Sequence, residues 1–486
     1  MNVTNRTNLY LLPIAAVLTA SCTFGPNYKR PVVETPLTYR GAPASTGTAA
    51  SLADLKWFDL FKDEALTTLV GDALKQNFEL RIAAERVLQA RAAYGITRSD
   101  QFPTVGAGVD LVAARASRRG ATQGLPEDTD SDVSYTQAGF NLGWELDVWG
   151  RLRRLSESAR AQYLATEEAR RGVTTTLIAD VTETYLLLRG LDYELDIARR
   201  TRDLATDSLR LTETRRAGGI ASGLDVRQAE QLLFTTTSRI ASLERQITEA
   251  ENTLSLLLGR APGDITRGRA LDALAAPPEV PAGLPSDLLE RRPDIRRAEQ
   301  ELIAANARIG VAKAEYFPRI SLTGFLGAQS RALTDLLSGG ARLASASVGA
   351  NAPIFDAGRR RGNVQLAEAV QREALVQYER SIYTALREVA DALAARAKTA
   401  EQRVQQERLV QALTESTRLA TDRYQGGLDS YLPVLDAQRN RFEGELELAR
   451  LRRIELAATV QLYRALGGGW ELQEPPTTQS PTPKGF

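Results

Sequence analysis

The sequence contains no histidine, one cysteine (Cys22) and one methionine among 486 residues. Histidine is the commonest general base near neutral pH and the commonest metal ligand, so both kinds of chemistry lack their usual residue. A single cysteine excludes an internal disulfide and a thiolate metal site. These absences argue against an enzyme, and we expect neither a metal nor a soluble cofactor.

Net charge, aromatic residues and long apolar runs are also scarce. Lysine plus arginine number 61 and aspartate plus glutamate 60, and this balance gives no support for a nucleic-acid partner, which would need a basic surface. No stretch after the N-terminus reaches the roughly 18 apolar residues of a transmembrane helix. Aromatic residues make up only 6% of the chain, as is typical of long helices packed along narrow seams.

The N-terminus has the features of an export signal. An apolar run from Leu9 to Leu18 precedes small residues and then Cys22. The segment resembles a bacterial lipoprotein signal, although Thr19 stands where that motif usually has leucine. We therefore predict a signal peptide over residues 1–21 and a covalent lipid on Cys22. The alternative is a plain secreted protein that is cleaved near Ser21.

The rest of the chain nearly repeats itself. Residues 79–110 resemble 294–325, and residues 147–259 resemble 355–467 with an offset of 208 positions. Each copy is a very long helical pattern interrupted by short alternating segments. Such a unit cannot close a core of its own, so the repeat indicates a part of a larger assembly.

The repeat suggests a domain organisation. We assign residues 22–285 to the first structural repeat, with a proline-rich linker at 260–285, and residues 286–467 to the second. Residues 468–486 form a tail that we expect to be partly disordered, because Glu474–Phe486 has four prolines together with serine and threonine.

Four segments alternate between apolar and polar residues. From Ala138 to Val148 every even position is apolar, and similar runs predict strands at about 102–113, 134–148, 317–327 and 345–356. Each run is about the 9–11 residues that a tilted membrane strand needs. Two soluble hairpins with one buried face would give the same alternation.

Two long helical hairpins follow the strand pairs. The patterns at 150–259 and 358–467 each begin with roughly 65 residues of helical spacing, or about 95 Å of helix. Helices of this length exceed a globular core and indicate a coiled-coil cylinder.

The backbone hydrogen-bonding groups of the predicted strands cannot all find partners within one chain. Four strands do not close a barrel, and open sheet edges do not survive in lipid, so the chain must form oligomers. Three chains would supply about twelve strands. The patterns therefore predict a mainly α fold with membrane β, in which strands from several chains form a β-barrel and the long helices form a coiled-coil cylinder.

Specific stretches then indicate a family. These are CTFGPNYKRP at 22–31, FKDEALTTLV at 61–70, LPSDLLERRPDIRRAEQEL at 284–302, YQGGLDSYLPVLDAQR at 424–439 and LYRALGGGW at 462–470. The chain resembles the outer membrane factors of tripartite efflux pumps, of the TolC, OprM and NodT type. The resemblance implies a passive homotrimeric duct in the bacterial outer membrane that extends into the periplasm. Its implied fold is a trimeric 12-stranded β-barrel, with four strands from each chain, that continues into a long α-helical coiled-coil barrel and has a mixed equatorial domain. It also implies as partners a periplasmic adaptor protein and an inner-membrane pump of the RND type, with drugs or other small molecules as cargo.

The same resemblance implies a periplasmic gate. By motif match, its gate or constriction positions are Asp225, Tyr424 and Asp436. Threefold symmetry would place the carboxylates in rings that repel one another and attract cations. The alternative is that these are ordinary solvated residues at the tip.

Two neighbouring residues add to this set. We expect Arg423 and Asp429 to pair across helices. This sequence departs from the TolC pattern, which has arginine at the position of Asp429 and aspartate at that of Pro433. Closure by the TolC contacts is therefore in doubt, and the OprM subtype is the closer expectation.

Paired glycines mark the two hairpin turns. We expect Gly218, Gly219, Gly426 and Gly427 to form tight turns that require a positive φ, and the turns to dock an adaptor protein. A second hypothesis is that the chain is itself a lipid-anchored periplasmic coiled-coil adaptor or scaffold protein. A third, a lipid-anchored hydrolase, has only scattered carboxylates in its favour. No phosphate-binding glycine loop is present, so we expect no energy conversion in this chain.

Overall fold

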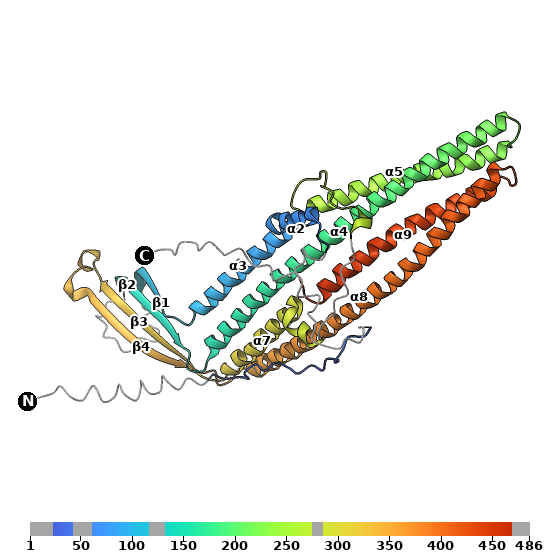
Figure 1. Ribbon diagram of the computed structural model, residues 1–486. Helices are drawn as coiled ribbons and strands as arrows, with labels where there is room; N and C mark the ends of the chain where they lie inside the picture. Colours follow the sequence, from blue (N-terminus) through green and yellow to red (C-terminus); the bar gives the residue numbers. More distant parts are fainter. Residues whose placement is uncertain (1–22, 42–60, 116–131, 275–284, 469–486) are drawn as a thin grey trace, which may run out of the picture. The chain divides into compact units, whose positions relative to one another are not determined.

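The computed structural model describes residues 23–41, 61–115, 132–274 and 285–468 (Figure 1). The predicted signal peptide at residues 1–21, the predicted lipidation site Cys22 and nearly all of the predicted tail lie outside these residues. Those three assignments stay predictions.

Helices dominate the described chain, with four strands between them. The elements of the first half are α2 (Glu64–Gln76), α3 (Phe78–Ser99), β1 (Thr104–Arg115), β2 (Asp132–Leu146), α4 (Arg151–Ala217) and α5 (Gly223–Leu257). Those of the second half are α6 (Leu288–Arg291), α7 (Pro293–Ala314), β3 (Arg319–Ser330), β4 (Arg342–Asn351), α8 (Arg359–Gln425) and α9 (Leu432–Ala465). Short 3₁₀ turns connect some of them. Helix α8 begins and ends 208 residues after α4, as the sequence repeat predicts.

The chain divides into two compact units. One comprises the described parts of residues 1–32, 87–165 and 298–378, and the other those of 33–86, 166–297 and 379–486. Each unit therefore takes segments from both sequence repeats. Within the described residues, no helix combines the length and the apolar character needed to cross a membrane.

The first unit contains one antiparallel sheet in the order β1-β2-β3-β4 (Figure 1). The strand register places Phe140 opposite both Ala107 and Leu326, and Leu322 opposite Val348. Because directly opposed residues share a face, the alternating apolar residues of all four strands gather on one side. The predicted alternation is confirmed.

All four strands differ from their expected bounds by two to five residues. The strand expected at about 345–356 is Arg342–Asn351, and the strand expected at about 134–148 is Asp132–Leu146. The first difference has a simple cause: Pro353 has no N–H to donate to a ladder, so pairing ends before it. Both hairpins also extend further toward their connecting loops than the apolar pattern does.

The apolar face of the sheet is exposed. Val109, Leu111 and Val348 have exposed fractions of 69%, 78% and 70%. Nothing in the described part of the chain covers this face, so the alternative of soluble hairpins with a buried face is wrong. Strands β1 and β4 each pair on one side only within the described sheet.

The opposite face carries a glycine pair beneath an aromatic ring. Gly139 lies directly opposite Gly327. A Cβ added at Gly139 would lie 2.7 Å from the ring of Phe325, so the ring occupies the space that both glycines leave. An aromatic side chain over strand glycines restores packing where the backbone alone would be bare.

An aromatic cluster joins the N-terminal segment to one end of the sheet. The ring of Phe24 stacks on Phe317 at 4.2 Å between centroids, and Phe317 stacks on Trp149 at 4.8 Å. The Trp149 indole N–H donates to the carbonyl of Pro318 at 2.8 Å, and Arg154 donates to the carbonyl of Phe24 at 3.2 Å. These contacts fix the residues that follow Cys22 beside the ends of β2 and β3.

A buried polar network organises the second unit. Asp63 caps α2 by accepting a hydrogen bond from the Leu66 N–H at 3.0 Å, and it also accepts one from the Arg269 N–H at 2.9 Å. The hydroxyl of Tyr185, a fully buried residue of α4, donates to the same carboxylate at 3.2 Å and accepts from the Gly268 N–H at 2.9 Å. A buried carboxylate needs several donors, and here three segments supply them.

Candidate functional site

The turn between α4 and α5 closes with a Schellman motif. The N–H of Ile220 donates to the carbonyl of Arg215 at 2.8 Å, and the N–H of Gly219 donates to the carbonyl of Arg216 at 3.0 Å. Gly219 has a φ of +76°, the left-handed conformation that this motif requires at one position. Gly218 does not have a positive φ.

The turn between α8 and α9 repeats this geometry. Leu428 donates to the carbonyl of Arg423 at 2.9 Å, and Gly427 donates to that of Tyr424 at 3.0 Å. Gly427 has a φ of +70°. The expected positive φ is confirmed for the second glycine of each pair and wrong for Gly218 and Gly426, because a Schellman motif needs only one left-handed residue.

Asp225 forms a capping box at the start of α5. Its N–H donates to the Ser222 hydroxyl oxygen at 3.2 Å, and its carboxylate accepts from the Ser222 N–H at 2.8 Å. The Ser222 hydroxyl also lies 3.0 Å from the carboxylate. The Asp225 side chain is therefore committed to the helix end, where it satisfies a backbone donor.

Arg423 and Asp429 form the expected ion pair, with Nε and Oδ2 at 2.5 Å. Asp429 belongs to the turn, so the pair joins the end of α8 to its own turn and does not cross between two helices. The hydrogen bond from Arg423 holds the pKa of Asp429 below its usual value.

Asp436 is exposed on the first turns of α9. Its carboxylate accepts from Arg439 and from Asn440, each at 3.2 Å, and both lie on the same helix. No described residue outside α9 donates a hydrogen bond to it. Of Asp225 and Asp436, the two aspartates placed at the gate by motif match, Asp436 has the weaker contacts within this chain.

Tyr424 has a different environment from the one its predicted gate role suggests. Its side chain is only 5% exposed, and its ring meets that of Tyr431 edge-on at 5.3 Å. The two tyrosines belong to a buried cluster with Ala205, Ala229, Leu232, Val434 and Leu435. This cluster joins the tips of the two hairpins within the second unit.

Arg215 completes the contact between the hairpins. Its guanidinium lies 4.6 Å from the centre of the Tyr424 ring and donates to the carbonyls of Tyr424 and Gln425 at 3.0 and 3.3 Å. It thereby satisfies carbonyls at the end of α8 from the end of α4. Burial raises the pKa of Tyr424, and the charge of Arg215 partly opposes this shift.

Sequence reasoning missed Arg215 and Tyr431. Arg215 corresponds in the repeat to Arg423, which was recognised as an ion-pair partner, so the repeat itself offered a signal. Tyr431 corresponds to Gly223, and an aromatic residue present in only one copy carries no repeat signal. The carboxylates Asp225 and Asp436 are not brought together by this chain: each hydrogen-bonds within its own helix end or helix.

The most specific stretch of the sequence, 284–302, holds a buried arginine. Arg292 makes a two-fold hydrogen bond to Asp294 at 3.0 and 2.7 Å, an ion pair with Glu388 at 2.8 Å and a hydrogen bond to the carbonyl of Ala465 at 2.8 Å. Its side chain is 9% exposed. The residue therefore ties α7, α8 and α9 together and has a structural role.

The same stretch also holds the N-terminal segment. Glu299 accepts hydrogen bonds from Tyr28 at 3.0 Å and from Arg30 at 2.7 and 2.6 Å. Asn306 on α7 donates to the carbonyl of Pro26 at 2.9 Å. Two sequence motifs nearly 270 residues apart thus form one contact.

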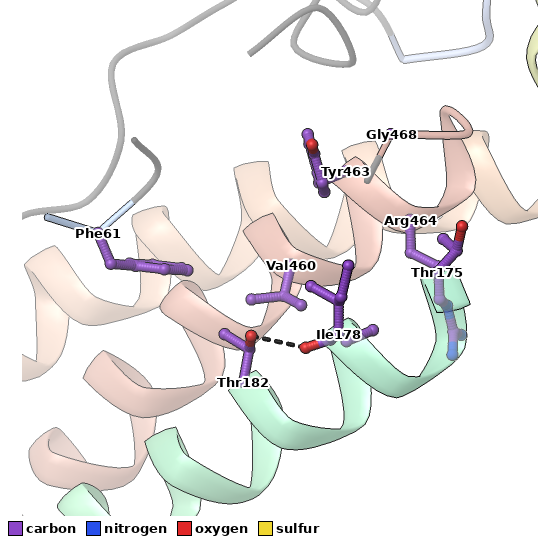
Figure 2. Close-up of a pocket in the computed structure, with 9 residues that line it drawn as sticks. Phe61, Thr175, Ile178, Thr182, Val460, Tyr463, Arg464 and Gly468 are labelled. Atoms are coloured by element: carbon purple, nitrogen blue, oxygen red, sulfur yellow. Dashed lines mark hydrogen bonds between the residues drawn. The ribbon is translucent and has the colours of Figure 1, made fainter. Parts of the chain in front are cut away.

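A small pocket lies between α4 and α9 (Figure 2). Ile178 and Thr182 of α4 lie opposite Val460 of α9, and Phe61, Tyr463 and Arg464 also line the pocket. The Thr182 hydroxyl donates to the carbonyl of its own helix at Ile178, so it offers no free donor to a ligand. We assign no ligand to this pocket.

Comparison with known proteins gives a consistent result. The outer membrane efflux protein family matches residues 69–260 and 284–468. The solvent efflux pump outer membrane protein SrpC of Pseudomonas putida is 41% identical over 95% of this chain and 99% of its own length. The outer-membrane channel OprN has a TM-score of 0.85 and 32% identity over 92% of this chain and all of its own. The open state of the MtrE outer membrane channel of Neisseria gonorrhoeae has a TM-score of 0.82 and 31% identity over 92% of this chain and 99% of its own.

Proposed function

Because the chain belongs to the outer membrane efflux protein family, we propose that it is the passive exit duct of a tripartite pump. Its place is the bacterial outer membrane, and its function is efflux. These matches favour a channel over the lipid-anchored adaptor that the sequence left open. The name of the relative SrpC supports organic solvents or other small apolar molecules as cargo.

The exposed apolar sheet carries the proposal. Its residues present hydrocarbon to their surroundings, as a membrane strand does on its lipid face. The outer edges of β1 and β4 have no partner in the described sheet, and unpaired backbone is not tolerated in lipid. Pairing β1 of one copy with β4 of the next removes every edge, and three copies of four strands give the twelve-stranded barrel of a homotrimer.

The hairpin turns support docking to a periplasmic adaptor. Ile220 and Leu428 occupy equivalent positions after the left-handed glycines, and each is 71% exposed. Exposed apolar side chains at equivalent turns suit a repeated protein contact. An inner-membrane pump of the RND type would supply the energy, and a lipid on Cys22 would add to the membrane hold of the barrel.

Reconstitution tests the duct directly. The purified chain should migrate as a trimer in detergent and produce steady pores in planar bilayers. A Cys22→Ser variant should still require detergent, because the sheet and not the lipid provides most of the apolar surface. Folded trimers that never conduct, or a Cys22→Ser chain that is monomeric in plain buffer, would refute the proposal.

A ring of Asp436 carboxylates is proposed as the constriction. Asp436→Asn should raise single-channel conductance or change cation block, whereas Asp225→Asn should mainly destabilise the start of α5. Asp207→Asn is a matched control, since Asp207 is an exposed aspartate with an arginine three residues further along its helix at 3.6 Å. Equal conductance in the Asp436 and Asp207 variants would exclude Asp436 from the constriction.

A further inference from the structure

The two repeats treat the start of their long helices differently. At the start of α4, Arg151 pairs with Glu145 at 2.8 Å and Arg153 pairs with Asp147 at 3.3 Å. Both acids lie at the end of β2 or just after it. The first copy therefore neutralises its two arginines within the chain.

The second copy lacks these acids. Arg359 and Arg361 of α8 occupy the positions equivalent to Arg151 and Arg153, but Pro353 and Phe355 stand where Glu145 and Asp147 would be. Both arginines are exposed, and neither guanidinium has a hydrogen-bond or ion-pair partner among the described residues.

The arginine between them is paired. Arg360 contacts Asp356 through a 2.6 Å ion pair. Asp356 is thus engaged by Arg360 and does not pair with Arg359 or Arg361. Two positive charges at this point are left without compensation by the described chain.

Exposed apolar side chains lie beside these charges. Ile354 is 97% exposed and Phe355 is 87% exposed. Large apolar residues are usually far less exposed in a folded chain. They follow the end of β4, whose apolar face is already exposed. The aromatic cluster of Phe24, Trp149 and Phe317 lies at this same end of the sheet.

We propose that Arg359 and Arg361 bind the phosphate groups of anionic phospholipids while Ile354 and Phe355 enter the adjoining acyl region. The proposal rests on the proposed function, because it requires the sheet to lie in a membrane. A guanidinium forms two parallel hydrogen bonds to a phosphate, and apolar side chains directly beside it match the boundary between headgroups and acyl chains.

The two arginine charges set the size of the expected lipid preference. An arginine near an anionic membrane surface contributes about 1 kcal/mol, which corresponds to about fivefold in binding. Arg359 and Arg361 together should therefore favour an anionic lipid over a zwitterionic one by more than tenfold, and salt should weaken the preference. The first copy should contribute little, because Glu145 and Asp147 already neutralise its arginines.

Quenching by brominated lipids measures this preference. Phe355→Trp places a fluorescent reporter in the proposed site, and the full chain is reconstituted with brominated phosphatidylglycerol or brominated phosphatidylcholine. The signal of the parent chain is subtracted. The reporter is then combined with Arg359→Gln and Arg361→Gln, with Pro353→Glu, or with Arg331→Gln. Arg331 is a matched control, being exposed just beyond the opposite end of β3.

The reporter chain should be quenched preferentially by phosphatidylglycerol. Loss of both arginines should bring the preference close to one, and Pro353→Glu should reduce it by restoring the acid of the first repeat. Arg331→Gln should leave it unchanged. An unchanged preference without both arginines would overturn the proposal.

The oligomeric state of the double arginine variant distinguishes lipid binding from contact with a second copy of the chain. If the double arginine variant loses its trimer in zwitterionic lipid, the arginines contact a second copy of the chain and the lipid assignment is wrong. Bilayer conductance is measured on the same preparations. Conducting trimers without lipid preference would overturn only this inference, whereas folded trimers that never conduct would overturn the duct itself.

Discussion

Replacing Arg292 tests whether a single buried side chain holds three helices together. Arg292→Met keeps much of the aliphatic volume but removes the guanidinium. The Asp294 and Glu388 carboxylates then lose their partner, and the Ala465 carbonyl loses its donor. Removing one member of a buried ion pair costs about 3–5 kcal/mol. Because the Asp294 and Glu388 side chains are 44% and 37% exposed and can regain water, we expect a loss at the low end of this range, about 3 kcal/mol.

Urea unfolding of the detergent-solubilised chain, followed by far-ultraviolet circular dichroism, measures this loss. Arg292→Lys should recover only part of it, because an ammonium group cannot make the two parallel hydrogen bonds to Asp294. Arg308→Met is the control, since Arg308 is exposed on α7, the helix that follows Arg292, and should change stability by less than about 0.5 kcal/mol.

A double-mutant cycle isolates the ion pair. Glu388→Gln alone, Arg292→Met alone and both together should give a coupling energy of about 1–2 kcal/mol between the two residues. A loss below about 1 kcal/mol in Arg292→Met, or a coupling energy near zero, would show that Arg292 does not hold these three helices together.

Three further predictions follow from the turns and the buried tyrosines. Gly219→Ala should destabilise the chain by about 1 kcal/mol because its φ is +76°, whereas Gly218→Ala should be neutral or slightly stabilising; thermal unfolding distinguishes them. Tyr424→Ala should cost about 3–5 kcal/mol through a cavity, but Tyr424→Phe should cost nothing because the buried hydroxyl has no partner among the described residues; a costly Tyr424→Phe would reveal a missing contact. Burial raises the pKa of Tyr185 to about 12. The unfolded tyrosine loses its proton near pH 10 and the folded one does not, so stability should fall between about pH 10 and 12, and Tyr185→Phe should remove this part of the decline.

Much of the fold was predictable because it depends on periodic patterns. The two-residue period of the strands survives any change in their neighbours, and the register confirms it residue by residue. The 208-residue repeat located the equivalent ends of α4 and α8. The predicted positions of the strand ends were less accurate, because a strand ends where its backbone N–H groups no longer find partners and not where the apolar spacing stops.

The candidate site was only partly predictable. The Arg423–Asp429 contact lies within six residues and could be expected from the sequence. Arg215 acts on Tyr424 from 209 positions away, and no local pattern predicts such a contact. The capping role of Asp225 depends on where α5 begins, which the turn geometry decides.

By itself, the sequence determined the local elements of this protein: two copies of a strand pair and a long helical hairpin, each ended by glycine where the backbone must turn left-handed. Tertiary structure alone decided which distant residues meet. Arg292 pairs with Glu388 and donates to the carbonyl of Ala465, and Arg215 donates to the carbonyl of Tyr424 from 209 positions away. Such contacts depend on atoms that folding brings within about 4 Å, and no periodicity in the sequence encodes them.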